Sequence, residues 1–126
     1  MIPYSRQSIQ KKDINSVIQV LKSNFLTQGP KVEQFEKSIR KITKAKYSVA
    51  VNSATSALHL ACISLGLKKN EYLWTVPNTF VASANCALHC GAKVDFVDID
   101  SNTLNISLEK LEIKLKNTIK KKLPKI

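Results

Sequence analysis

A hydroxyl-rich segment that directly follows an apolar run is the feature that most constrains the fold of this chain. Residues 47–51 read Tyr-Ser-Val-Ala-Val, a β-branched and aromatic pattern typical of a strand, and residues 52–59 read Asn-Ser-Ala-Thr-Ser-Ala-Leu-His, which indicates the start of a helix. Such a junction has two interpretations. In the first, Asn52 or Ser53 is a simple N-cap of the helix. In the second, free backbone N–H groups, the helix dipole and the hydroxyls together form a cradle for a phosphate. Taken alone, the octapeptide favours the cap.

The remaining sequence alternates between predicted helices and strands. Two amphipathic helices come first: Asp13 can N-cap one of them, turn-forming residues at 27–30 end it, and apolar residues from 32 to 42 mark the second. The later elements are strands at 47–51, 72–76 and 93–99, a helix that ends near Gly66, a helix over 79–89 that Gly91 closes, and a lysine-rich helix capped by Ser107.

Strands that alternate with single helices predict parallel pairing. We therefore expect an α/β fold with three parallel-type strands, a helical segment over 1–45 and an incomplete α/β domain over 46–126. Open sheets of this kind bind ligands at the carboxyl ends of their strands, and the junctions at Asn52 and Pro77 are both such ends. Residues 123–126 begin another strand, so an exposed sheet edge and partly uncovered helices predict poor solubility or a partner.

Composition argues against several classes of protein. No apolar run approaches the roughly 20 residues of a membrane span, and the first residues lack the order of a secretion signal, so we expect a globular protein in the cytoplasm and no membrane partner. The three cysteines are expected to be reduced and packed as small apolar side chains. Cys86, His89 and Cys90 lie near one predicted helical face, but no second ligand pair accompanies them, so no metal is expected.

The net charge of +11 is the main argument for a nucleic-acid partner, because clustered lysines attract polyanions. From Ser107 onward seven lysines face two glutamates, so this tail contributes +5 of the total. A binder of single strands would interleave aromatic side chains for stacking, and the tail has none. A nucleic-acid partner is therefore the less favoured interpretation.

Several motifs taken together resemble a known family. They are residues 25–30, 35–36, 52–59 and 75–86, and their order and spacing are similar to the N-terminal part of the DegT-type nucleotide-sugar aminotransferases, which use pyridoxal 5′-phosphate (PLP). A closer likeness, in residues 2–7, 73–75 and 90–100, is to members that act in pseudaminic acid synthesis, a route to surface-glycan precursors. These aminate C4 of a UDP-linked 4-keto-6-deoxy-N-acetyl sugar, with glutamate as the amino donor.

The resemblance implies a fold and a set of site residues. The fold would be the N-terminal part of the large domain of a fold type I enzyme, the aspartate-aminotransferase type, and the full-length enzyme would be a homodimer. Thr55 and Ser56 would bind the PLP phosphate, and Phe80 would stack on the pyridine ring, although core packing is an equal alternative for Phe80. Thr27 and Gln28 would belong to the nucleotide-sugar site, unless they form only a helix-breaking turn.

The family's Schiff-base lysine lies in a portion that these residues do not match. No lysine of this chain stands in that motif, so none is nominated as catalytic and we expect an N-terminal fragment that is inactive by itself. Two other classes stay open. The chain is a non-catalytic module that pairs with a full-length homologue through its first two helices, or a basic protein whose nucleic-acid affinity falls steeply with salt.

Overall fold

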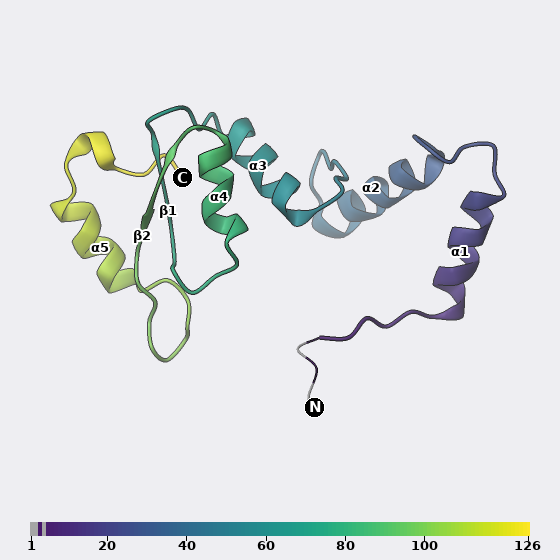
Figure 1. Ribbon diagram of the computed structural model, residues 1–126, viewed down its shortest axis with the longest axis horizontal. Coiled ribbons are helices and arrows are strands. Elements are labelled where there is room, and N and C mark those ends of the chain that lie inside the picture. The colour runs from purple at the N-terminus through teal and green to yellow at the C-terminus, as the bar shows by residue number, and fades with distance from the viewer. Residues whose placement is uncertain (1–2, 4) are drawn as a thin grey trace. The chain divides into compact units, whose positions relative to one another are not determined.

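The computed structural model describes residue 3 and residues 5–126, in two compact units: one ends at Ala50, and the other spans Val51–Ile126 (Figure 1). Ile2 and Tyr4, which contribute to the family resemblance, lie outside the described residues. No helix in the described part of the chain is both long and apolar enough to cross a membrane. The elements are α1 (Lys11–Leu21), α2 (Pro30–Thr43), α3 (Ala54–Ser64), β1 (Tyr72–Thr75), α4 (Ala82–His89), β2 (Lys93–Phe96), α5 (Leu108–Asn117) and a 3-10 turn, η1 (Lys120–Lys122).

The first two helices form where the sequence predicts them, but α1 starts earlier than expected. Gln10 is its N-cap, and Asp13, the predicted cap, is the third helical residue. The Asp13 carboxylate accepts the Gln10 N–H at 2.8 Å, so it stabilises the helix start from inside the first turn. Helix α2 begins with Pro30, where a missing N–H costs nothing, directly after the N-cap Gly29.

Neither α1 nor α2 buries its apolar stripe. On α1, Val17 is 59% exposed and Leu21 is 65% exposed, and on α2 Phe35 is 57% exposed. Both helices follow the amphipathic 3.6-residue pattern, so local sequence explains why they form. Stability in proteins comes mainly from packing such a face, and in the described residues of this unit that packing is small.

The strand predicted over residues 47–51 does not form, so the sheet has two named strands and not three. Tyr47 is 74% exposed and Val49 is 75% exposed. The Ala50 N–H donates to Glu36 Oε1 at 2.8 Å, a side-chain acceptor in place of a neighbouring strand. A β-branched run becomes a strand only when a partner supplies the ladder of hydrogen bonds, and the described residues supply none here.

The sheet is parallel, with Leu73 opposite Val94 and Trp74 opposite Asp95. Its hydrogen bonds extend past the named strands, since the Val97 N–H donates to Thr75 O at 2.9 Å. Residues 124–126 run parallel to β1 on its other side: Lys125 N–H donates to Tyr72 O at 2.7 Å, and Trp74 N–H donates to Ile126 O at 3.0 Å. The expectation that the end of the chain begins another strand is therefore supported.

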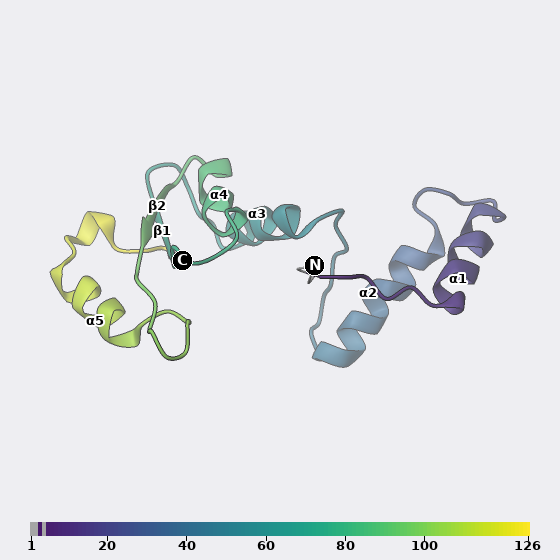
Figure 2. The same cartoon turned by 60° about the horizontal axis from the view of Figure 1, so that its bottom comes forward.

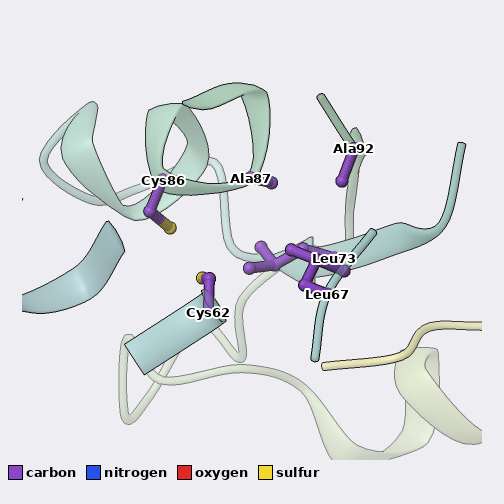
Figure 3. Close-up of a cluster of buried hydrophobic side chains, with 6 residues drawn as sticks. All are labelled: Cys62, Leu67, Leu73, Cys86, Ala87 and Ala92. Atoms are coloured by element: carbon purple, nitrogen blue, oxygen red, sulfur yellow. The ribbon is translucent and has the colours of Figure 1, made fainter. Parts of the chain in front are cut away.

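Helix α4 packs against one face of the sheet, and α3 packs against α4, as Figures 1 and 2 show. The buried cluster between these elements consists mostly of small side chains: Cys62, Leu67, Leu73, Cys86, Ala87 and Ala92. Figure 3 shows the sulfur atoms of Cys62 from α3 and Cys86 from α4 facing each other. Ala87 is fully buried, so α4 approaches the strands closely. Burial, with Cys86 as a neighbour, raises the pKa of Cys62 to about 11, which keeps this thiol protonated.

Glycines end two of the helices as predicted. Gly66 has φ +75° and follows α3, and Gly91 has φ +69° and follows α4. The Leu67 N–H then returns to Cys62 O at 3.0 Å, which satisfies a carbonyl of the last helical turn. Residues that follow each glycine are thereby directed back into the strands.

Helix α5 lies on the opposite side of the strands from α4. Successive side chains of a strand point to opposite faces, so the paired residues Trp74 and Asp95 share the face opposite Leu73 and Val94. Lys114 of α5 lies over this face, with its Nζ 4.9 Å from the centre of the Trp74 ring and 2.7 Å from Asp95 Oδ1. The predicted cap is confirmed, because Ser107 Oγ accepts the Lys110 N–H at 3.2 Å.

Leu73 tests the core described above. Leu73→Ala is expected to lower the free energy of unfolding of the 126-residue chain by about 2 to 5 kcal/mol, because it empties part of a packed cluster. Urea unfolding followed by circular dichroism measures the change. Leu65→Ala is the matched control, because Leu65 is 61% exposed, and an equal loss in both variants would contradict the assigned core.

Asp95 gives a pH-dependent test. The hydrogen bond from Lys114 lowers the pKa of Asp95, so the carboxylate stabilises the fold above its unfolded pKa of about 3.9, and this contribution is lost as pH falls through the folded value. Asp95→Asn is expected to be less stable than the natural chain at pH 7 and to converge with it at acidic pH. Glu112→Gln, which removes a pair inside α5, is the control and should change stability less. A difference that persists unchanged at acidic pH would contradict the pairing.

Candidate functional site

The start of α3 is organised by a compact hydrogen-bond network. Ser53 is the N-cap, and its Oγ accepts the Ser56 N–H at 3.1 Å. The Ser56 hydroxyl donates to Asn52 Oδ1 at 2.8 Å and lies 3.0 Å from Ser53 Oγ. Both residues considered as caps therefore have roles: Ser53 caps the backbone, and Asn52 orients the Ser56 hydroxyl.

This network leaves hydrogen-bond donors available at the helix start. Four N–H groups of a first turn lack intrahelical partners. Ser56 N–H is bound by the Ser53 side chain, and Ala57 N–H is bound by the Ser53 carbonyl at 3.1 Å. The Ala57 bond is the first intrahelical one, so within the described residues the N–H groups of Ser53, Ala54 and Thr55 are left, the last two beside the exposed Thr55 side chain. No acidic residue lies in this turn, so the positive end of the helix dipole is not neutralised locally.

Phe80 lies between β1 and α4 and has an exposed ring. The polypeptide leaves β1 at Thr75, and the Phe80 carbonyl then accepts the Ser83 N–H at 3.0 Å, which holds the backbone at the beginning of α4. The side chain is 74% exposed, so within the described residues it is not core. An exposed aromatic ring on an ordered backbone provides a face on which a planar ligand can stack.

Thr55, Ser56 and Phe80 belong to the same compact unit, because α3 and α4 pack side by side (Figures 1 and 2). Thr27 and Gln28 belong to the other unit, in the turn between α1 and α2. Gln28 has φ +52°, and a Cβ at the following Gly29 would approach Phe25 O to 3.0 Å. This turn is tightly constrained, and Gln28 with Phe25 and Pro30 lines a small hollow on the N-terminal unit.

The lysine-rich tail is engaged with carboxylates to a degree that the sequence did not indicate. Lys110 pairs with Asp98 at 2.6 Å, Lys114 with Asp95 at 2.7 Å, and Lys116 with Glu112 at 2.6 Å. Two of these pairs connect α5 to the end of β2, across 12 and 19 residues of sequence. The sequence does contain a signal for these two pairs. Lys110 and Lys114 are four residues apart and so share one face of the helix, and two aspartates, Asp95 and Asp98, stand at the end of the preceding strand.

The cysteines have a packing role in the structure. Cys62 and Cys86 are buried, Cys90 is half-buried, and all three are free thiols. Cys86 Sγ donates to the Ser83 carbonyl at 3.3 Å. Among the residues that the structure describes, no group of three or more histidine, cysteine, aspartate or glutamate side chains is arranged to hold a metal ion.

Proteins with similar sequences carry names that refer to the transamination of a sugar or to polysaccharide biosynthesis. The chain is 48% identical over 115 residues to the UDP-4-amino-4,6-dideoxy-N-acetyl-beta-L-altrosamine transaminase of Campylobacter jejuni, which covers 91% of this chain and 30% of the relative. It is 47% identical over 111 residues to the spore coat polysaccharide biosynthesis protein SpsC of Bacillus subtilis, which covers 88% of this chain and 28% of that protein. The chain thus spans about 30% of the length of these relatives.

Solved structures with the same fold are also found. The PLP form of Spr1654 from Streptococcus pneumoniae, which is described as a sugar aminotransferase, matches this chain with a TM-score of 0.83 and 31% identity. The match covers 89% of this chain and 29% of that one. A GDP-4-keto-6-deoxymannose-3-dehydratase with a trapped PLP-glutamate geminal diamine matches with a TM-score of 0.82 and 27% identity, over 94% of this chain and 32% of that one. The family model matches residues 7–122, and the chain belongs to the DegT/DnrJ/EryC1/StrS aminotransferase family.

Proposed function

We propose that this chain supplies the phosphate-binding helix start and a ring-stacking residue of a PLP-dependent nucleotide-sugar aminotransferase. The observation that carries the proposal is the start of α3, where two N–H groups are left without a protein bond beside the Thr55 hydroxyl. Membership of the aminotransferase family and the PLP form of a structural neighbour support it.

The residues at this helix start fit a phosphate ester. A dianion would accept hydrogen bonds from the Ala54 and Thr55 N–H groups and from the Thr55 hydroxyl, and it would lie at the positive end of the dipole. The Ser56 hydroxyl could join by exchanging Asn52 Oδ1 for a phosphate oxygen, whereas its N–H is bound by Ser53. The site holds an anion without a cationic side chain, which leaves no charge to be neutralised when it is empty.

Phe80 supplies the second element of the proposal. Its exposed ring would stack on the pyridine ring and restrict the tilt of the cofactor relative to the helix start. PLP, when bound, serves as the electron sink of amino-group transfer. This chain would therefore bind and orient the cofactor, and we assign none of its lysines as the residue that forms the Schiff base or moves the proton.

The finer substrate assignment rests on similarity to relatives. We propose a UDP-linked 4-keto-6-deoxy-N-acetyl sugar as acceptor and glutamate as donor, as in the synthesis of a pseudaminic acid precursor, in a cytoplasmic homodimer. Two altrosamine transaminases of Campylobacter jejuni, 48% and 46% identical to the chain, support this sugar class. Thr27 and Gln28 are proposed to contact the nucleotide sugar, since the constrained turn between α1 and α2 holds both in a defined position.

A non-catalytic interaction module is the second candidate, because the apolar stripes of α1 and α2 are exposed. Such a module would associate with a full-length homologue and would show no affinity for the cofactor. The nucleic-acid alternative is weaker, because Lys110, Lys114 and Lys116 of the tail are engaged with carboxylates.

Pyridoxamine 5′-phosphate tests the phosphate site, because its amine cannot form imines with the chain's lysines. Titration into the 126-residue chain is expected to shift the amide resonances of Ala54 and Thr55, whereas pyridoxamine without phosphate is not. Ser56→Ala is expected to weaken binding by about tenfold, the value of one charge-assisted hydrogen bond. Ser64→Ala, at the other end of α3, should bind normally. Equal shifts with both ligands, or none with either, would overturn the phosphate assignment.

Phe80→Ala tests the stacking role. The variant is expected to bind pyridoxamine 5′-phosphate about two- to tenfold more weakly, which is the range for one aromatic pair, and to bind inorganic phosphate unchanged. Phe35→Ala is the control, because Phe35 is exposed on α2. If Phe80→Ala and Phe35→Ala retain the same affinity as the natural chain, Phe80 does not stack on the cofactor.

A further inference from the structure

The outer edge of β2, on the side away from β1, shows an arrangement that the proposed function does not use. In a strand, the N–H and C=O of one residue point to the same side, and the side alternates along the chain. Lys93 and Val97 donate to β1, to Glu71 O at 2.8 Å and to Thr75 O at 2.9 Å. Val94, Phe96 and Asp98 therefore direct their backbone groups to the outer edge, and side-chain partners are found there at Phe96.

Side chains occupy the backbone groups of Phe96 at this edge. The Phe96 N–H donates to Asp95 Oδ1 at 2.8 Å, and the Phe96 carbonyl accepts from Lys114 Nζ at 2.6 Å. Asp95 Oδ1 and Lys114 Nζ are themselves 2.7 Å apart. One ion pair thus provides the acceptor and the donor that a neighbouring strand would otherwise provide.

The backbone of Ser107 binds the next group that points outward, the Asp98 carbonyl. The Asp98 carbonyl accepts the Ser107 N–H at 3.0 Å, and Ile99 forms an antiparallel bridge with Ile106. Lys110 holds the Asp98 carboxylate at 2.6 Å, one helical turn before Lys114. Two Asp–Lys pairs therefore hold α5 along the carboxyl end of β2.

The opposite side of the sheet differs. There, residues 124–126 bind β1 through backbone hydrogen bonds of 2.7 and 3.0 Å, which is ordinary strand pairing. Exposed sheet edges promote pairing between chains, and charged side chains directed at an edge are a known means of preventing it. Lys114, the lysine at the outer edge of β2, is half-buried, with 25% of its side chain exposed. Its Nζ lies 4.9 Å from the centre of the Trp74 ring.

We propose that Lys114, oriented by Asp95, blocks strand addition at Phe96 on the outer edge of β2. Lys114 replaces a strand partner at Phe96 O, and Asp95 replaces one at Phe96 N. Removal of the ammonium group leaves the carbonyl free to accept from a second copy of the same edge.

Lys114→Met tests the closure because it keeps an unbranched side chain of similar length and removes the donor. The intermolecular β-sheet signal in infrared spectra of the 126-residue chain is expected to appear at about tenfold lower protein concentration than in the natural chain, the worth of one hydrogen bond to a charged group. Lys116→Met is the matched control, since Lys116 is on the same helix and pairs only with Glu112. Lys114→Arg should restore closure, because a guanidinium can reach both acceptors. An equal β-sheet signal in Lys114→Met and Lys116→Met would overturn the proposal.

Amide exchange provides a second measurement that does not depend on the Lys114 variant folding. In the natural chain, the Phe96 amide is expected to exchange about as slowly as the Val97 amide, which is bonded to β1. Asp95→Ala is expected to speed exchange at Phe96 by about tenfold more than at Val97, where the rise reflects only the stability lost with the ion pair. Exchange of Phe96 at an unprotected rate in the natural chain would show that the edge is open and that the proposal is wrong.

Discussion

The parallel pairing of β1 with β2 is the interaction on which the rest of the C-terminal unit depends. It places Leu73 and Val94 on one face, where α3 and α4 pack, and Trp74 and Asp95 on the other, where Lys114 of α5 binds. Because side chains alternate along a strand, one register decides both layers. A shift by one residue would put Trp74 into a cluster of small side chains and would expose Leu73.

The start of α3 depends much less on this pairing. Its network joins Asn52, Ser53 and Ser56, which are within four residues of one another, so capping needs only local sequence. The helix start therefore forms although residues 47–51 are not a strand. This independence matters for the proposed cofactor role, since donors at a helix end are positioned by the helix itself.

Ion pairs between lysines and aspartates hold helix α5 against the sheet. The net charge of +11 suggested a polyanion partner, but Lys110 and Lys114 join α5 to the end of β2 through Asp98 and Asp95. These carboxylates have pKa values below their ordinary range because lysine hydrogen bonds favour the ionised form. Lys114 thus covers the face of the sheet that carries Trp74, and Lys110 holds α5 to the end of β2.

Periodicity and turn chemistry were sufficient to predict five helices and the glycines that end two of them, because these features are local. The helix start after Asn52 was predicted from the same local signals, and the structure finds unbonded N–H groups there. Phe80 was singled out by the family resemblance and fell inside a helix predicted over 79–89, whereas α4 starts at Ala82 and leaves the Phe80 ring exposed before it. The strand expected at 47–51 failed because pairing is decided by distant residues, and Glu36 takes its Ala50 N–H instead. The cap of α1 moved to Gln10 because a carboxylate can accept from a helix start at more than one position. The ion pairs across 12 and 19 residues, and the face that each strand side chain occupies, came only from the tertiary structure, since register has no local signature.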